Sequence, residues 1–254
     1  MKKPDDLLRW MKPPADLTLQ PRHADIWRIS LDPSINSGER LEPDVVKGFE
    51  STLSADETRR AAKFKFPADR ERYVVAHGFL RNVLSRYLGG EPSHFMFSIN
   101  SHGKPALREH ELEFNLTHSA DFVLAAVTRN RKIGVDVERI RSGISAHVIA
   151  RQYFSNAEVA ELEALPPGLR ERAFFVGWTR KEAYIKAQGL GLSLGLDTFD
   201  VSITPDHPAV LRAVRPNSDE AARWTLLSFP VDPRYEAAVA VGSNEVDFRL
   251  WDWI

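Results

Sequence analysis

The two halves of this 254-residue chain carry the same order of predicted elements, and this repetition restricts the fold more than any other feature. Each half has a short helix opened by a serine, a long helix closed by glycine, and then several strand-like runs. The first pair of helices covers 51–64 and 70–90, and the second pair covers about 155–165 and 168–188. We therefore predict two similar α+β halves with a junction near 129–133 and a groove between them, where a site is commonly found.

Strand patterns support the same division of the chain. The run 121–128 resembles 234–241 in pattern, although no literal repeat is visible. We predict an N-terminal α+β half over 1–132 and a C-terminal α+β half over 133–254. Residues 1–22 are rich in proline and charge, so we expect them to form a loose arm. A monomer is sufficient for this design, because one chain supplies both sides of the groove.

Charge and composition exclude several classes of protein. Lys and Arg together number 34 and Asp and Glu 35, so no global charge attracts nucleic acid or a membrane surface. The absence of cysteine excludes disulfides, thiolate zinc sites and a cysteine nucleophile. No apolar run approaches the ~20 residues of a membrane span. Acids and prolines interrupt the N-terminal sequence, which does not resemble a signal peptide, so we expect a cytoplasmic protein.

One strand-like segment carries two like charges. In IGVDVERI (133–140), Asp136 and Glu138 lie two residues apart between apolar neighbours. Alternate residues of a strand share a face, so their Cα atoms would be roughly 6.6–6.8 Å apart. At a strand end the two acids could simply be solvated, but the apolar flanks favour partial burial. Because buried carboxylates repel each other unless a positive group lies between them, we interpret the pair as candidate metal ligands.

The long helix of the second half carries further charges beside a predicted apolar stripe. In WTRKEAYIKAQGLG (178–191), Glu182 and Lys186 are four residues apart, and Lys181 adds a second cation next to Glu182. A solvated helix with one Glu–Lys pair, worth roughly a few tenths of a kcal/mol, would explain the pattern. The functional interpretation is a third carboxylate with two lysines at the mouth of the groove.

Basic residues gather in and after the short helix of the first half. They are Arg59, Arg60, Lys63, Lys65, Arg70 and Arg72. In a chain of balanced charge they form either a local anion site or a solvated helix face. Further along, Lys104 lies in the turn of SHGKPAL, and FNLTHSA places Thr117, His118 and Ser119 at a strand end.

Two other functional interpretations are weak. A Ser–His hydrolase would be expected to carry a G-x-S-x-G elbow, which this sequence lacks. The glycine-rich segment GLGLSLG (189–195) follows a helix rather than a strand and does not have the G-x-G-x-x-G spacing of a dinucleotide site.

The motifs taken together resemble a known family. GKPAL, FNLTHS, GVDVE and WTRKEAYIK have the order and spacing found in the 4′-phosphopantetheinyl transferases of the surfactin-synthetase-activating type, over roughly residues 50–242. The resemblance implies two α+β halves in a pseudo-twofold arrangement with the active site in the cleft between them. It also implies transfer of the 4′-phosphopantetheine arm of coenzyme A to a serine of an apo acyl or peptidyl carrier protein, with release of 3′,5′-ADP.

The resemblance also assigns roles to individual residues. Asp136, Glu138 and Glu182 would hold Mg²⁺ or Mn²⁺. Lys186 would act at the reacting phosphates, and Glu182, directly or through a water, would take the proton of the serine, with Glu158 as the second candidate base. The residues expected to bind coenzyme A as substrate are Arg60, Lys63, Arg72, Lys104, Thr117, His118, Lys181 and Lys186.

Three positions depart from the family pattern, and two other functions stay open. Glu57 stands where relatives often carry lysine, Thr117 replaces a more usual serine, and Val137 cannot be a ligand. The alternatives are a non-catalytic binder of coenzyme A or a nucleotide, and an acid-rich metal-binding or interaction module. The complete set of acids and lysines argues against the first, and the second leaves the paired cations unexplained.

Overall fold

The computed structural model describes residues 8–32, 41–108, 110–217 and 219–253. Its helices are α1 (Pro43–Ser51), α2 (Ala55–Ala61), α3 (Pro67–Leu88), α4 (Ala146–Tyr153), α5 (Asn156–Ala164) and α6 (Pro167–Gln188). Its strands up to the middle of the chain are β1 (Trp10–Met11), β2 (His23–Ser30), β3 (Phe97–Ile99), β4 (Pro105–Leu107), β5 (Leu112–Ser119) and β6 (Phe122–Arg129). The later strands are β7 (Ile133–Arg139), β8 (Phe199–Val201), β9 (Leu211–Val214), β10 (Thr225–Ser228), β11 (Tyr235–Val241) and β12 (Asp247–Asp252).

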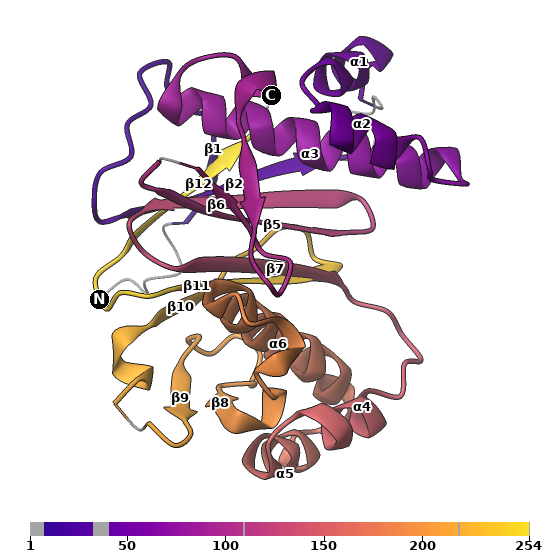
Figure 1. Ribbon diagram of the computed structural model, residues 1–254. Helices are drawn as coiled ribbons and strands as arrows, with labels where there is room; N and C mark the ends of the chain where they lie inside the picture. Colours follow the sequence, from indigo (N-terminus) through magenta and orange to yellow (C-terminus); the bar gives the residue numbers. More distant parts are fainter. Residues whose placement is uncertain (1–7, 33–40, 109, 218, 254) are drawn as a thin grey trace.

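The main elements form four layers in the order helix, sheet, sheet, helix (Figure 1). The first sheet has the strand order β1-β12-β2-β6-β5, and the second has β10-β11-β7. Helix α3 covers the outer face of the first sheet, and α6 covers the outer face of the second (Figure 1). The predicted mixed α+β architecture with two similar halves is confirmed. Among the described helices, none combines the length and apolarity needed to cross a membrane.

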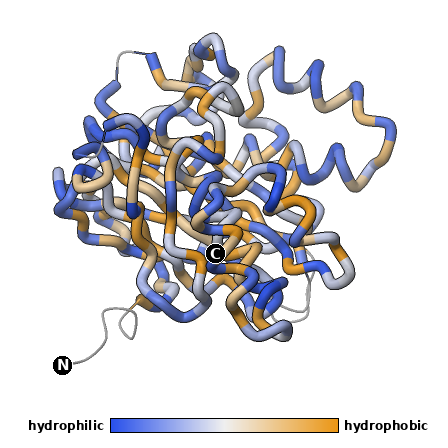
Figure 2. Tube along the Cα trace, turned by 90° about the horizontal axis from the view of Figure 1, so that it is seen from below, coloured by the Kyte–Doolittle hydropathy of each residue, from blue (hydrophilic) through white to orange (hydrophobic). Residues whose placement is uncertain are grey.

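Three hydrophobic clusters fill the spaces between the layers. Val75, Phe79 and Val83 of α3 pack on the first sheet, as their helical spacing predicts. A second cluster lies between α6 and the outer face of the second sheet. The third lies between the two sheets and contains Ile26 from one and Val135 from the other. Figure 2 shows hydrophobic segments mostly toward the middle of the molecule and hydrophilic segments mostly at its periphery.

The two halves repeat one another element by element. In each, a strand (β2, β7) is followed by a short capped helix (α2, α5), a long helix (α3, α6), a small hairpin and two paired strands. The strand orders β2-β6-β5 and β7-β11-β10 correspond. The long helices both start at a proline and both have 22 residues, so helix positions correspond at an offset of 100. Both short helices begin at the predicted serine, and each serine forms a capping box, Ser54 with Glu57 and Ser155 with Glu158.

Each long helix approaches a neighbour closely at a glycine. A Cβ atom on Gly134 of β7 would lie 2.2 Å from the carbonyl oxygen of Ala183 and from the amide nitrogen of Ala187, both on α6. A Cβ atom on Gly78 of α3 would lie 2.4 Å from Cβ of Phe49 on α1. Such distances are impossible for a side chain, so glycine allows α6 to lie directly on β7.

The sheets meet where β5 and β7 run side by side. Three polar side chains at alternate positions of β5 point toward β7. Asn115 accepts from the amide of Val135 at 2.9 Å, and the hydroxyl of Ser119 accepts from the amide of Arg139 at 3.1 Å. Edge-strand amides that would otherwise be unpaired are thereby satisfied by side chains. We call this contact the β5–β7 junction.

The structure corrects the expectation of a loose arm at 1–22. Residues 1–7 lie outside the described part, but Trp10–Met11 form β1 and pair in parallel with β12. The carbonyl oxygen of Thr18 accepts from Arg249, and Leu19 is buried. Strand β12 pairs with β2, so the end of the predicted C-terminal half completes the sheet of the N-terminal half. The division at residue 132 stays a prediction.

Candidate active site

A cavity of about 810 Å³ opens between the two halves. Its first-half wall comes from α3 and the end of β5, where Arg72, Tyr73, His77 and His118 face it. Its second-half wall comes from the end of β7 and the residues that follow, including Glu138. The predicted groove between the halves therefore coincides with a cavity that contains predicted site residues from both.

The acidic residues of β7 face α6 beside this cavity. Asp136 is buried, and its Oδ1 accepts from the ammonium group of Lys186 at 2.6 Å and from the hydroxyl of Thr117 at 3.2 Å. Lys186 also donates to Thr117 at 3.0 Å. Glu138 accepts from the hydroxyl of Ser119 at 3.0 Å. The β5–β7 junction therefore holds the acids of one half against hydroxyl groups of the other.

The electrostatics place Glu182 with these acids. Burial, followed by the charge of Asp136, raises the pKa of both Glu138 and Glu182, and Glu138 raises the pKa of Glu182 further. Burial also raises the pKa of Asp136, while Lys186 acts in the opposite direction. Each carboxylate thus makes the others harder to ionise, which is the behaviour of like charges sharing one site. We call Asp136, Glu138 and Glu182 the acid cluster.

The acid cluster has the donor chemistry of a divalent cation site. Oδ2 of Asp136 is buried and receives no hydrogen bond, and no described residue donates to the carboxylate of Glu182. Oxygen ligands of this kind suit Mg²⁺ or Mn²⁺. Across the described residues, however, no three His, Asp or Glu side chains are already arranged to enclose a metal ion. The residues fit such an ion chemically, and the assignment of ligands stays a prediction.

His118 has the surroundings expected of a phosphate-binding residue. It lines the cavity, and burial, followed by the charges of Lys186 and Arg72, lowers its pKa. His118 and Arg72 line the same cavity, and Lys186 is held by Thr117 on the strand that carries His118. Contact of these side chains with a phosphate stays a prediction.

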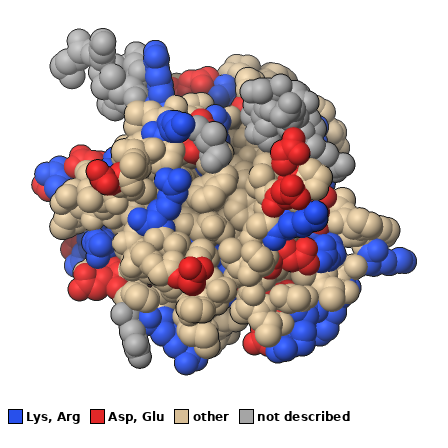
Figure 3. Space-filling view, turned by 90° about the horizontal axis from the view of Figure 1, so that it is seen from above, with Lys and Arg blue, Asp and Glu red and all other residues tan. Residues whose placement is uncertain are grey.

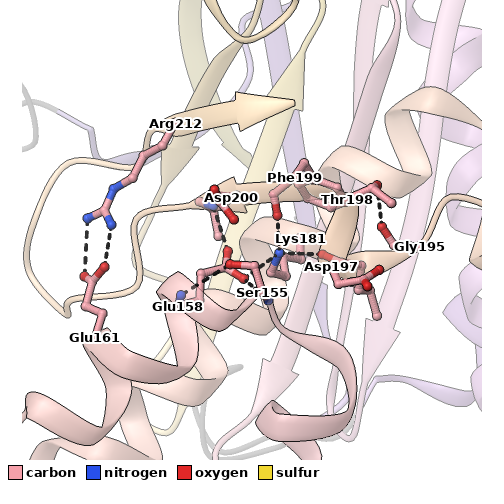
Figure 4. A network of polar contacts seen from close by, with 12 residues as sticks. Ser155, Glu158, Glu161, Lys181, Gly195, Asp197, Thr198, Phe199, Asp200 and Arg212 are labelled. Atoms are coloured by element: carbon pink, nitrogen blue, oxygen red, sulfur yellow. Dashed lines mark hydrogen bonds and ion pairs between the residues drawn. The ribbon is translucent and has the colours of Figure 1, made fainter. Parts of the chain in front are cut away.

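Lys181 and Glu158 are placed elsewhere, and we correct both assignments. Their side chains form an ion pair with an Nζ–Oε2 distance of 2.7 Å, at 0% and 1% exposure (Figure 4). Lys181 also donates to the carbonyl oxygens of Leu196 and Phe199, and Glu158 accepts from the amide of Val201. Because every polar atom of the pair is used inside the second half, neither side chain is available to coenzyme A or to a serine.

The first half contains an equivalent ion pair, which explains the departure at Glu57. Glu57 accepts from Arg81 at 2.8 Å, and Arg81 also donates to carbonyl oxygens after α3. The guanidinium lies 4.9 Å from the ring centre of Phe97, as the ammonium of Lys181 lies 4.3 Å from that of Phe199. Each capping-box glutamate thus binds a buried cation of the long helix. We call these pairs the clamps.

Lys104 is used at the junction of the halves. Its ammonium donates to the carbonyl oxygens of Ile133, at the start of β7, and Ala187, at the end of α6, both at 3.1 Å. Asn100 donates to the carbonyl oxygen of Gly189 nearby. The side chain expected to hold the nucleotide therefore ties together the two elements that carry the acid cluster, and it does not line the cavity described above.

The remaining basic residues lie at the rim. Arg60 and Lys63 are exposed, and the guanidinium of Arg60 lies 5.7 Å from the ring centre of Tyr73, which lines the cavity. Arg72 lines the cavity and pairs with Asp69 at 3.1 Å. Figure 3 shows basic and acidic side chains interleaved on the side where α1 and α2 lie. Contact of Arg60 and Lys63 with a ligand stays a prediction.

Sequence reasoning gave no role to several residues that shape this site. Asn115 and Ser119 hold the junction, and Tyr73 and His77 form part of the cavity wall. The polar residues at every second position of FNLTHS were a usable signal, because alternation places them on one face of a strand. Tyr73 and His77 are four residues apart on α3, but their pattern does not distinguish a cavity from a core.

Comparisons with known proteins agree with the geometry. A family model described as the 4′-phosphopantetheinyl transferase superfamily matches residues 132–240, and one described as the N-terminal part of 4′-phosphopantetheinyl transferase matches 43–130. The chain is 36% identical to 4′-phosphopantetheinyl transferase HetI of Nostoc sp. strain PCC 7120, over 96% of this chain and 98% of the relative. It is 30% identical to the transferase Sfp of Bacillus subtilis strain 168, over 75% and 83% of the two chains. It is 31% identical to the transferase psf-1 of Bacillus pumilus, over 84% and 88%.

Proposed function

Because the chain belongs to the 4′-phosphopantetheinyl transferase family and is an enzyme of that class, we propose that it transfers the 4′-phosphopantetheine arm of coenzyme A to a serine of an apo acyl or peptidyl carrier protein. The other product is 3′,5′-ADP. The observation that carries this proposal is the acid cluster with Lys186 and His118 at the edge of a cavity between the halves. An enzyme that splits a diphosphate needs such a combination of cations and carboxylates around it.

The residues of the chain divide the work by position. Lys186, His118 and Arg72 bind and orient the diphosphate of coenzyme A. Thr117 holds Lys186 and Asp136 in fixed relation, because its hydroxyl contacts both. Binding energy spent on this alignment lowers the barrier to attack by the serine hydroxyl. A divalent cation, Mg²⁺ in our proposal, would be held by the acid cluster and would supply charge neutralisation at the phosphates when bound.

Glu182 is our candidate for the group that removes the serine proton. It lies in the acid cluster beside Asp136, and it would take the proton directly or through a water. It also lacks a hydrogen-bond donor among the described residues, which leaves its oxygens available. Glu158 is excluded from this role by its place in the second-half clamp.

The direct test is incubation of the purified chain with coenzyme A, Mg²⁺ and an apo carrier protein, followed by intact-mass measurement of the carrier. We expect a gain of one phosphopantetheine, release of 3′,5′-ADP, and loss of both when EDTA is added. A carrier without its serine is the control. Coenzyme A binding without any gain in mass would contradict the proposal. Gel filtration of the active sample tests the further proposal that a monomer suffices.

A further inference from the structure

His77 occupies the cavity wall in an arrangement that the fold itself does not require. Its Nδ1 lies 3.3 Å from Oε1 of Glu57, and the ring lies 4.1 Å from that of Tyr73 between ring centres. Nearly a third of the side chain, 30%, is exposed, and it lines the cavity between the halves. A histidine that is held by a carboxylate while it faces a cavity has one ring nitrogen fixed and one available.

The hydrogen bond to Glu57 decides which nitrogen is available. The pKa of Glu57 is lowered to about 2, so at neutral pH its carboxylate is ionised and can only accept. Nδ1 of His77 is therefore the donor to Glu57. No described residue accepts from Nε2, which is left for a ligand in the cavity.

The repeat in the second half shows that the clamp is complete without a histidine. The position on α6 that corresponds to His77 is Gly177, and the clamp of Glu158 and Lys181 forms there with the same geometry. In place of a histidine, the backbone amide of Val201 donates to Oε1 of Glu158, the oxygen that is not paired with Lys181. Because the second-half clamp forms without an imidazole, the first-half clamp does not need His77 for its stability. We therefore relate His77 to the cavity that it lines.

The position of His77 also separates it from the reacting diphosphate. His77 lies on α3, in the first-half wall of the cavity, whereas the acid cluster lies on β7 and α6 of the second half. His118, at the end of β5, lines the same cavity. Coenzyme A carries a second anionic group, the 3′-phosphate of its ribose, at a distance from the diphosphate.

We propose that His77 binds the 3′-phosphate of coenzyme A, with Nε2–H donating to a phosphate oxygen and Nδ1–H donating to Glu57. This inference rests on the proposed function for the identity of the ligand. It makes His77 a residue that selects coenzyme A over its 3′-dephosphorylated form. Glu57 is the positioning residue that fixes the ring.

Two substitutions test the roles of Nδ1 and Nε2 of His77 separately. His77→Asn keeps a donor near the place of Nδ1 and removes the group that faces the cavity, whereas His77→Gln extends a donor toward the place of Nε2. Loss of one charge-assisted hydrogen bond should weaken binding of 3′,5′-ADP and of coenzyme A to His77→Asn by about tenfold or more. His77→Gln should retain most of the affinity. Binding of 3′-dephospho-coenzyme A should change less than about twofold in either variant.

Isothermal titration with these three ligands measures the effect without any carrier protein. His94→Gln, at an exposed position on the short turn after α3, is the matched control and should bind all three ligands as the parent does. Equal weakening for coenzyme A and its dephosphorylated form, or unchanged affinity in His77→Asn, would overturn the proposal. Thermal unfolding identifies a folding defect in His77→Asn; the ratio of its affinities for coenzyme A and for the dephosphorylated form then decides, because a folding defect weakens both equally and leaves that ratio unchanged. Selective binding by a chain that does not modify any carrier would refute the transferase proposal while supporting this one.

Discussion

Arg86 on α3 and Lys186 on α6 hold the same position in two helices of equal length, yet they contact different groups. The guanidinium of Arg86 lies 5.5 Å and 5.3 Å from the ring centres of Trp27 and Trp253. Lys186 donates instead to buried Asp136 on β7. In both halves this helix position places a cation against the strand beneath it. The strand residue, Trp27 or Asp136, decides whether the cation packs on an aromatic ring or forms an ion pair.

The same comparison holds for the clamps. Both halves use a capping-box glutamate and a buried cation to fix the short helix on the long one. The second-half clamp is fully buried, whereas the side chain of Glu57 is 13% exposed and contacts His77, which lines the cavity. We infer that the first half provides substrate contacts from α3 and β5, and that the second half provides the acids from β7 and α6.

The largest effect on stability is expected for a substitution in the fully buried second-half clamp. Lys181→Met should lower the free energy of unfolding by about 3–5 kcal/mol, because it leaves Glu158 buried without its partner. Arg81→Met should cost less, since Glu57 keeps His77 and some contact with water. Urea denaturation of both variants measures the difference. The double variant Lys181→Met with Glu158→Gln should recover part of the loss, and equal losses in the two single variants would show that the clamps do not differ.

Substitution at the acid cluster should remove activity with little effect on folding. Asp136→Asn keeps the shape of the side chain but removes a charge beside the phosphates, so turnover should fall by about 10²–10³-fold. The thermal midpoint should stay level or rise, because like-charge repulsion with Glu138 and Glu182 is relieved. Asp200→Asn, which breaks an ion pair with Arg215 on the hairpin of β8 and β9, is the control. Near-normal turnover in Asp136→Asn would remove the basis for the metal assignment.

The first-half clamp should make stability depend on acid pH. The pKa of Glu57 is about 2 in the folded chain against an ordinary 4.5, so its contribution is present above about pH 4.5. That contribution, about 3 kcal/mol, should be lost as the pH falls from 4.5 toward 2. Comparison of the parent with Glu57→Gln by urea denaturation at pH 7 and pH 3 measures it. The two proteins should differ much less at pH 3, and a constant difference would contradict the pairing.

The two groups of cations near the cavity should differ in importance. Lys186→Ala should lower turnover by about 10- to 100-fold, because it removes a contact to the phosphates and leaves Asp136 without its main partner. Lys63→Ala should lower it only a few-fold, since Lys63 is exposed at the rim. Steady-state kinetics with saturating carrier protein compares them. Similar losses would contradict the placement of Lys186 at the reacting diphosphate.

The smallest effect is expected at the first-half counterpart of Lys186. Arg86→Ala should reduce stability by about 1 kcal/mol through loss of its contacts with two tryptophan rings. Turnover per folded molecule should be unchanged, because Arg86 contacts two tryptophan rings of the first half and does not line the cavity. A loss of activity in a fully folded Arg86→Ala protein would mean that the two halves do not divide their roles as described.

The sequence was informative where structure is local. The serine starts of both short helices, both long helices and the strand at 133–138 follow from nearby residues, and the structure confirms them. The parallel pairing of β1 and β12 was missed, because it joins residues more than 200 positions apart and leaves no periodic signal. Helix α4 was also missed, since eight residues with exposed Val148 give a weak pattern.

The site was predictable only in part for a related reason. Asp136, Glu138, Glu182 and Lys186 were found because their motifs are short and ordered. The roles of Lys181 and Glu158 were wrong because α6 is buried on several sides, so a lysine next to Glu182 can point into the core. The serines that open the two short helices were visible in the sequence, but the pairing of Glu57 and Glu158 with a cation on the long helix depends on packing that no spacing rule describes.

The pairing of β12 with β2 has a consequence for biosynthesis. The sheet of the first half lacks an inner strand until residues 247–252 have been made, after the whole of the second half. At roughly 5–20 residues per second, a nascent chain waits on the order of ten seconds with the edge of β2 exposed. Until those residues emerge, the edge of β2 stays unpaired and the incomplete first half is open to chaperones and proteases.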